Sequence, residues 1–215
     1  MKSFKGFACA LVSAAAFGTI PLFSLPVIAA GMSYGSILVV RFFLAAVLMG
    51  IALKVLKKSF AVTKKELLLT AAFSLCYTGT AFILFWSYRY ITGGMAASLL
   101  FIYPVFVTLI MILRYKTPVS ALTLISLITA VAGVFVISSD GSRVDARGVA
   151  LAIAGAFIYA LYIVGVNRTS LKNMENLKLT FYILLFSFFF TAAGNAMTGN
   201  FAIASGPRVL SDLFM

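Results

Sequence analysis

Long apolar segments, separated by short clusters of charged residues, make up most of this chain of 215 residues. A helix that crosses the hydrocarbon core of a bilayer needs roughly 20 mostly apolar residues. Seven segments meet this length, and they cover approximately residues 6–30, 34–55, 66–89, 89–114, 116–140, 147–168 and 179–197. The pattern therefore predicts an all-α fold, a polytopic membrane helix bundle.

The composition supports lipid as the solvent for most of the chain. Apolar residues make up 63% of the sequence and charged residues only 10%, whereas about 25% of the residues in soluble domains are charged. The net charge is +12, but the Lys and Arg residues lie in the gaps between apolar segments. A nucleic-acid-binding protein would cluster them on one solvated face. We therefore expect the lipid bilayer as a partner and no nucleic acid.

The positive charges also predict an orientation in the membrane. Twelve of the 17 Lys and Arg residues fall on one side of a seven-span topology and four on the other. Because cytoplasmic loops carry an excess of Lys and Arg, we expect a multi-pass protein of the plasma (inner) membrane with a cytoplasmic N-terminus. The first apolar segment is longer than the core of about 7–15 residues found in signal peptides, which favours a retained helix.

Residues that carry catalytic or metal chemistry are scarce within the predicted spans. The chain has no histidine, both cysteines lie in apolar segments, and all five acidic residues fall outside the spans or at their edges. An active site or a metal site needs such groups close together. We therefore expect no enzyme activity, no catalytic residues, no metal and no cofactor.

Two segments of the chain resemble each other at an offset of 142 residues. Residues 5–11 are similar to residues 147–153, and small residues recur at the matching positions 10, 14, 18 and 152, 156, 160. This spacing places them on one face of a helix, where small residues let membrane helices pack closely. The alternative is chance similarity, because Ala and Gly are common in membrane helices.

A repeat at this offset would divide the chain into two units. Residues 1–139 would form a five-helix repeat, and residues 145–215 an incomplete second repeat of two helices and a tail. Because five is an odd number, the second unit would be inverted relative to the first, as in many secondary transporters. A complete second unit needs three more helices, so we expect the chain to be truncated.

One charged residue, Arg41, lies well inside a predicted span. It is about 10 Å from the end of its helix at a rise of 1.5 Å per residue. An intramembrane arginine can face the bundle interior and bind an anionic substrate group or helix carbonyls. Its long side chain could equally reach the headgroups by snorkelling. Both interpretations are open at this point.

Tyrosine and proline residues supply the other candidate substrate-binding groups. Tyr77, Tyr103, Tyr159 and Tyr162 could contribute hydroxyls and rings to a pore with apolar walls, and Pro104 could free backbone carbonyls that line a cavity. The alternatives are packing or an interfacial aromatic belt for the tyrosines, and a structural bend for the proline. A belt at the outer ends of these helices would explain most of Trp86, Tyr88, Tyr90 and Tyr103.

The order of several short segments resembles the EamA-type transporters of the drug/metabolite transporter superfamily. The similar segments are Arg41-Phe42-Phe43-Leu44-Ala45-Ala46, the stretch from Trp86 to Leu100, Tyr103-Pro104-Val105-Phe106, Ala132-Gly133-Val134-Phe135-Val136, and Arg147-Gly148 followed by Tyr159-Ala160-Leu161-Tyr162. The resemblance covers nearly all of residues 5–195. It implies ten helices in two inverted five-helix units that move metabolites such as amino acids or sugars, often outward.

The chain differs from this family pattern after the fourth helix, where Arg114-Tyr115-Lys116-Thr117-Pro118 stands in place of the usual Gly-Glu pair. Three helices of the family plan also have no counterpart. Our first hypothesis is a carrier that moves a small organic metabolite, amino acid-like or sugar-like, across the plasma membrane by alternating access, as an exporter. The alternatives are a truncated protein without transport activity, or a half-carrier that needs a second chain, as a homodimer or with a missing C-terminal half.

Overall fold

Helices form all the regular structure in the part of the chain that is described. The computed structural model describes residues 2–118, 120, 123, 125, 127–129, 132–133 and 145–198. Within them, six helical segments are long and apolar enough to cross a membrane: Gly6–Ala29, Tyr34–Val55, Lys64–Ser87, Gly93–Tyr115, Ala146–Arg168 and Asn176–Met197. The predicted all-α membrane bundle is confirmed. The remaining predicted span, residues 116–140, and the predicted tail lie largely outside the described residues.

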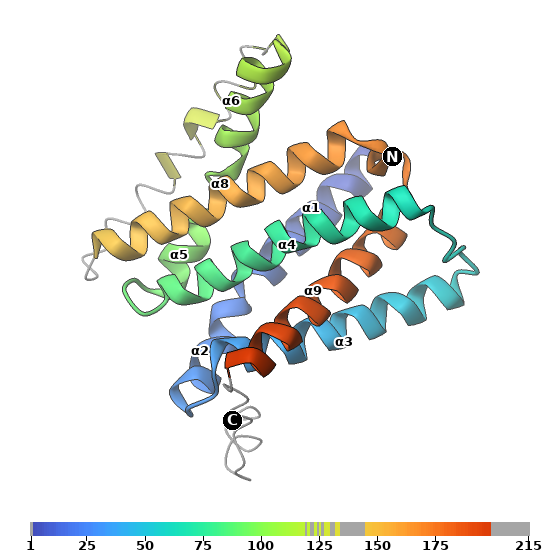
Figure 1. Ribbon diagram of the computed structural model, residues 1–215. Helices are drawn as coiled ribbons and strands as arrows, with labels where there is room; N and C mark the ends of the chain where they lie inside the picture. The colour runs from blue at the N-terminus through green and yellow to red at the C-terminus, as the bar shows by residue number, and fades with distance from the viewer. Residues whose placement is uncertain are drawn as a thin grey trace.

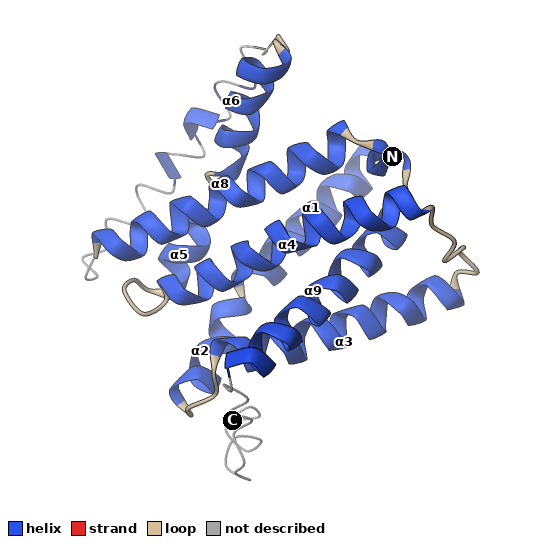
Figure 2. Cartoon of the chain, viewed as in Figure 1, coloured by secondary structure: helices blue, strands red, loops and turns tan. Residues whose placement is uncertain are grey.

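Each span consists of one helix or of two consecutive helices (Figure 1; Figure 2). The divided spans are α1 (Lys2–Gly18) with α2 (Ile20–Ala29), and α5 (Gly93–Leu100) with α6 (Tyr103–Tyr115). The single helices are α3 (Tyr34–Val55), α4 (Lys64–Ser87), α8 (Ala146–Arg168) and α9 (Asn176–Thr198), and the 3-10 helix η1 (Ser170–Asn173) precedes α9.

Proline accounts for both divisions. Pro21 and Pro104 stand in the first turn of α2 and α6, where a residue without an N–H donor is tolerated. In a helix interior, the same residue would remove a hydrogen bond and collide with the preceding turn. The chain therefore starts a new helix at each of these prolines, while Pro26 lies inside α2.

Four helices lie side by side in the order α3, α9, α4 and α8 (Figure 1). The pairs α3–α9, α9–α4 and α4–α8 are in contact, and α5 and α6 pack against α8. The first span contacts this group through α2, which meets α3 and α5, and through α1, which meets α5. Within the described residues, the first span therefore does not pack on the last span, α9, through a major contact of its own, and α3 lies in contact with both.

One end of the bundle carries most of the positive charge, and we call it the lysine-rich end. It consists of residues 54–65, the last turns of α6 and α8, and the start of α9. Polar contacts hold these segments together: Lys58 Nζ lies 2.8 Å from Glu175 Oε1, and Lys178 Nζ donates a hydrogen bond of 2.9 Å to the Ala61 carbonyl. The start of α9 is thus fixed to the loop between α3 and α4.

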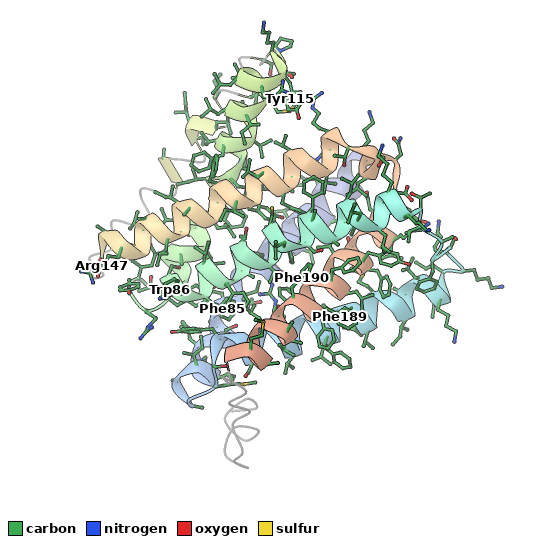
Figure 3. The ribbon with its side chains drawn as sticks, viewed as in Figure 1. Phe85, Trp86, Tyr115, Arg147, Phe189 and Phe190 are labelled. Carbon is green, nitrogen blue, oxygen red and sulfur yellow. The ribbon has the colours of Figure 1, made fainter. Side chains whose placement is uncertain are left out.

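The ends of α6 and α8 meet at the same end of the bundle. The Arg168 guanidinium lies 4.2 Å from the centre of the Tyr115 ring, which Figure 3 labels at the tip of α6. Arg168 also donates a hydrogen bond of 3.3 Å to the Thr117 hydroxyl. The segment that departs from the family pattern therefore has a defined contact with α8.

At the opposite end, glycines bring helices close together. A Cβ atom at Gly35 of α3 would overlap the Asn195 side chain of α9, and one at Gly148 of α8 would lie 2.8 Å from Ile91. Figure 1 shows that α3 and α9 run in opposite directions, as do α1 and α8. An inverted repeat requires these directions, although the repeat and its boundaries, 1–139 and 145–215, stay predictions.

The two predicted stripes of small residues have different surroundings. In α8, Ala152, Ala156 and Ala160 are fully buried, as close helix packing requires. In α1, Ala14 is exposed, and a Cβ atom at Gly18 would meet no atom within 4 Å. Among the described residues, the stripe is therefore buried in α8 and not in α1, where Ala14 lines a cavity instead.

Replacing Gly93 by alanine is expected to destabilise the protein, whereas the same change at Gly94 is not. A Cβ atom at Gly93 would overlap Pro21 of α2, while one at Gly94 would meet no atom within 4 Å. Overpacking costs about 1–3 kcal/mol, and alanine otherwise stabilises a helix by roughly 0.5–1 kcal/mol relative to glycine. Thermal unfolding in detergent measures both variants. Equal midpoints would contradict the packing of α2 on α5.

Candidate functional site

A cavity of about 350 Å³ lies between the helices. Its wall draws on both divided spans and on α3, α4 and α8. Small-molecule sites in proteins have volumes of about 300–1,000 Å³. The cavity is therefore large enough for a metabolite, and residues from both predicted units form its wall.

The wall is mainly apolar, with a few polar groups. Its apolar part includes Phe17, Phe42, Leu84, Phe85 and Leu100. Its polar side chains are Ser13, Arg41, Tyr77, Thr80, Tyr88, Tyr103 and Tyr159. Such walls are typical of sites that hold an organic ligand and orient it through a small number of polar contacts.

Four tyrosines from three helices form a ring cluster beside the cavity. The ring centres are 4.8 Å apart for Tyr103 and Tyr159, 5.6 Å for Tyr159 and Tyr162, and 5.6 Å for Tyr77 and Tyr162. Tyr77, Tyr103 and Tyr159 line the cavity, whereas Tyr162 supports the cluster from outside the wall. The structure brings the four predicted residues together, and their binding of substrate stays a prediction.

Arg41 of α3 lies in the cavity wall. Its neighbours Leu38 and Phe42 are buried in the core, and Arg41 itself is half-buried. Of the two interpretations of the sequence, this position matches the one in which the arginine faces the bundle. Arg41 is the only charged residue among the described residues that form the wall, so the cavity carries a positive charge.

Two predictions differ from the observed wall. Pro104 was a candidate binding residue, but it lies in the first turn of α6 outside the wall, and its neighbour Tyr103 occupies the wall instead. Tyr88 was expected in the interfacial belt, but it lines the cavity. Its spacing from Tyr77 contained this information, because residues that are 4, 7 and 11 positions apart share one face of a helix.

Phe85 and Trp86, which follow each other near the end of α4, differ in their exposure (Figure 3). Phe85 is fully buried and Trp86 is 50% exposed. The Phe85 ring centre lies 5.2 Å from that of Tyr88 and 6.5 Å from that of Tyr34. The belt position predicted for Trp86 is compatible with its exposure, and Phe85 holds Tyr88 in the wall.

Thr80 of α4, a residue of the cavity wall, also contacts the neighbouring helix α8. Its hydroxyl donates to the Cys76 carbonyl at 3.1 Å and lies 3.4 Å from the Gly155 carbonyl of α8. The backbones of α4 and α8 are close at this point, because a Cβ atom at Gly155 would lie only 3.8 Å from the Thr80 carbonyl. Among the described residues, no group of three or more His, Cys, Asp or Glu side chains could hold a metal ion.

The fold and the cavity define a multi-pass membrane protein with a site for a small molecule. The model of the EamA-like transporter family matches residues 4–139. Because this match covers more than half of the chain, the protein belongs to the EamA-like transporter family, which is a family of transporters and not of enzymes. The resemblance found in the sequence is thereby confirmed. No curated protein and no solved structure matches the chain.

Cysteine substitutions on α4 are expected to distinguish the cavity from the lipid-facing surface. Ala81 lines the cavity, whereas Leu75 of the same helix is 59% exposed on the outside. A charged thiol reagent needs water and an ionised thiol. With Cys9 and Cys76 replaced by serine, we expect labelling of Ala81→Cys and none of Leu75→Cys in permeabilised membranes. Equal labelling of the two, or labelling of neither, would contradict a water-filled cavity.

Proposed function

We propose that the protein moves a small organic metabolite, amino acid-like or sugar-like, out of the cell across the plasma membrane by alternating access. The observation that carries this proposal is the cavity of about 350 Å³, which lies among membrane-spanning helices of a chain in a transporter family. A carrier needs such a site near the middle of the membrane. The outward direction rests on the resemblance to the family.

The divided spans support a conformational change around the cavity. Pro21 lines the cavity at the start of α2, and Phe101 and Tyr103 line it where α5 gives way to α6. In many transporters, discontinuous helices border the substrate site and change their angle during transport. Both interruptions are therefore placed where bending would open or close access to the cavity.

The distribution of charge supports an orientation. The lysine-rich end gathers the loop between α3 and α4, the end of α8 and the start of α9. By the positive-inside rule this end would face the cytoplasm, and the N-terminus of α1 lies on the same side (Figure 1). The proposed topology thus begins in the cytoplasm.

Filling the cavity is expected to abolish transport. The full-length protein is reconstituted in vesicles, and the fluxes of amino acids, short organic acids and sugars are measured with labelled compounds. We expect saturable flux of at least one compound, loss of this flux in Ala81→Trp, and normal flux in Leu75→Trp, because Ala81 lines the cavity while Leu75 is exposed on the outer surface.

The comparison of these two variants separates a filled cavity from a general effect of tryptophan. Both are first checked for a monodisperse peak in size-exclusion chromatography, so that only folded protein is reconstituted. Absence of flux for every compound would contradict the proposal, and so would equal flux in Ala81→Trp and the unmodified protein.

A further inference from the structure

Arg41, the one charged residue among the described residues of the cavity wall, needs a partner. The guanidinium of Arg41 is always ionised in proteins, and a charge in an apolar environment is costly unless it is paired and hydrogen-bonded. Within the described residues, the only ion pair joins Lys58 to Glu175 at the lysine-rich end. Neither an ion pair nor a hydrogen bond connects Arg41 to another described residue. An anion in the cavity would supply the partner that the described residues do not.

A second polar group in the same wall also has no partner among the described residues. The hydroxyl of Tyr88 is buried and makes no hydrogen bond there, while the Tyr88 side chain lines the cavity together with Arg41. A buried hydroxyl without a partner is unfavourable, so an acceptor placed between the two groups would satisfy both.

Aromatic packing keeps the two groups in place. Phe42, the residue after Arg41, has its ring centre 5.9 Å from that of Tyr77. Tyr88 packs against Phe85 at 5.2 Å. Because both neighbours lie in the buried core, the turn of α3 that carries Arg41 and the ring of Tyr88 have fixed places in the wall. Preorganisation reduces the cost of ordering side chains on binding.

We propose that Arg41 and Tyr88 bind the carboxylate of a substrate that has one carboxylate group, so that the protein selects monocarboxylates, amino acid-like compounds among them, over sugars. This inference rests on the proposed carrier function. The guanidinium would donate two parallel hydrogen bonds to the carboxylate oxygens, and the Tyr88 hydroxyl would donate a third. A phosphate ester carries a charge of about −1.5 to −2, which one arginine does not balance.

The rest of such a substrate has a defined place. The carboxylate would lie at the Arg41 and Tyr88 side of the wall, and the remaining part would contact the cluster of Tyr77, Tyr103 and Tyr159. Tyrosine rings bind apolar groups, and their faces also attract ammonium groups. The site can therefore accept a carboxylate with an apolar body, with or without an amino group.

Matched pairs of acids and amides test the carboxylate assignment without a transport assay. Neutral L-amino acids and short monocarboxylates, each next to its primary amide, and a set of hexoses are tested for thermal stabilisation of the purified full-length protein in detergent. An acid and its amide have nearly the same shape and differ in charge. We expect at least one acid to bind about tenfold or more tightly than its amide, since hydrogen bonds between charged groups are strong.

Substitutions test whether the preference for the acid over its amide depends on Arg41 and Tyr88. Arg41→Gln should bring the acid and its amide to equal affinity, and Tyr88→Phe should weaken the acid by roughly three- to tenfold and the amide by less, because a hydrogen bond to a neutral acceptor is weaker. Arg89→Gln is the matched control, because it removes the same charge from a neighbouring groove between α3, α4 and α9, and it should leave the preference intact. If Arg41→Gln does not fold, Arg41→Lys, which retains the charge, should keep a reduced preference for the acid.

Several results would overturn the assignment. They are equal or tighter binding of amides or hexoses by the unmodified protein, an unchanged acid preference in Arg41→Gln, and displacement of the bound acid by phosphatidylglycerol, which would show that Arg41 binds a lipid headgroup. Flux of a neutral compound without carboxylate binding would refute the carboxylate site and leave the carrier function intact. Selective acid binding without any flux would refute the carrier function alone.

Discussion

The packing of α4 against α8 is the contact on which the cavity depends. Lipid is as apolar as the helix surfaces, so membrane helices associate through close packing and hydrogen bonds. Ala156 of α8 is fully buried, and the Thr80 hydroxyl of α4 reaches the Gly155 carbonyl across the contact. Large side chains at these positions of α8 would separate the two backbones. Because α4 carries Tyr77 and α8 carries Tyr159, the same contact brings the wall of the cavity together.

The proline interruptions and the polar wall occupy the same region of the protein. Pro21 and Tyr103 belong to the restarted helices α2 and α6, and both line the cavity. A span that is divided in this way has fewer backbone hydrogen bonds to break when it bends. The structure thus places the polar groups of the wall next to the two interruptions of the spans.

Hydropathy was sufficient to predict six of the spans. The sequence predicted only part of the cavity wall. Long apolar segments have one stable solution in lipid, a helix that satisfies its own backbone hydrogen bonds, and six of the predicted spans are found. For the site, Arg41 and three of the four tyrosines do line the cavity. Pro104 does not, and the residue before it, Tyr103, lies in the wall instead. Tyr88 was missed, because nearness to a helix end does not reveal which side of the helix faces the bundle.

The sequence alone determined that the chain is a membrane protein, the approximate positions of six of its spans, and which side of the bundle carries the positive charge, because all three follow from transfer of side chains between water and lipid. Only the tertiary structure decided which face of each helix lines the cavity, and that Arg41 and Tyr88 share one wall. In a span that is apolar on every side, periodicity does not distinguish a face toward lipid from a face toward another helix. That distinction depends on which helices pack together, and small residues such as Ala156 acquire their role only from the partner that covers them.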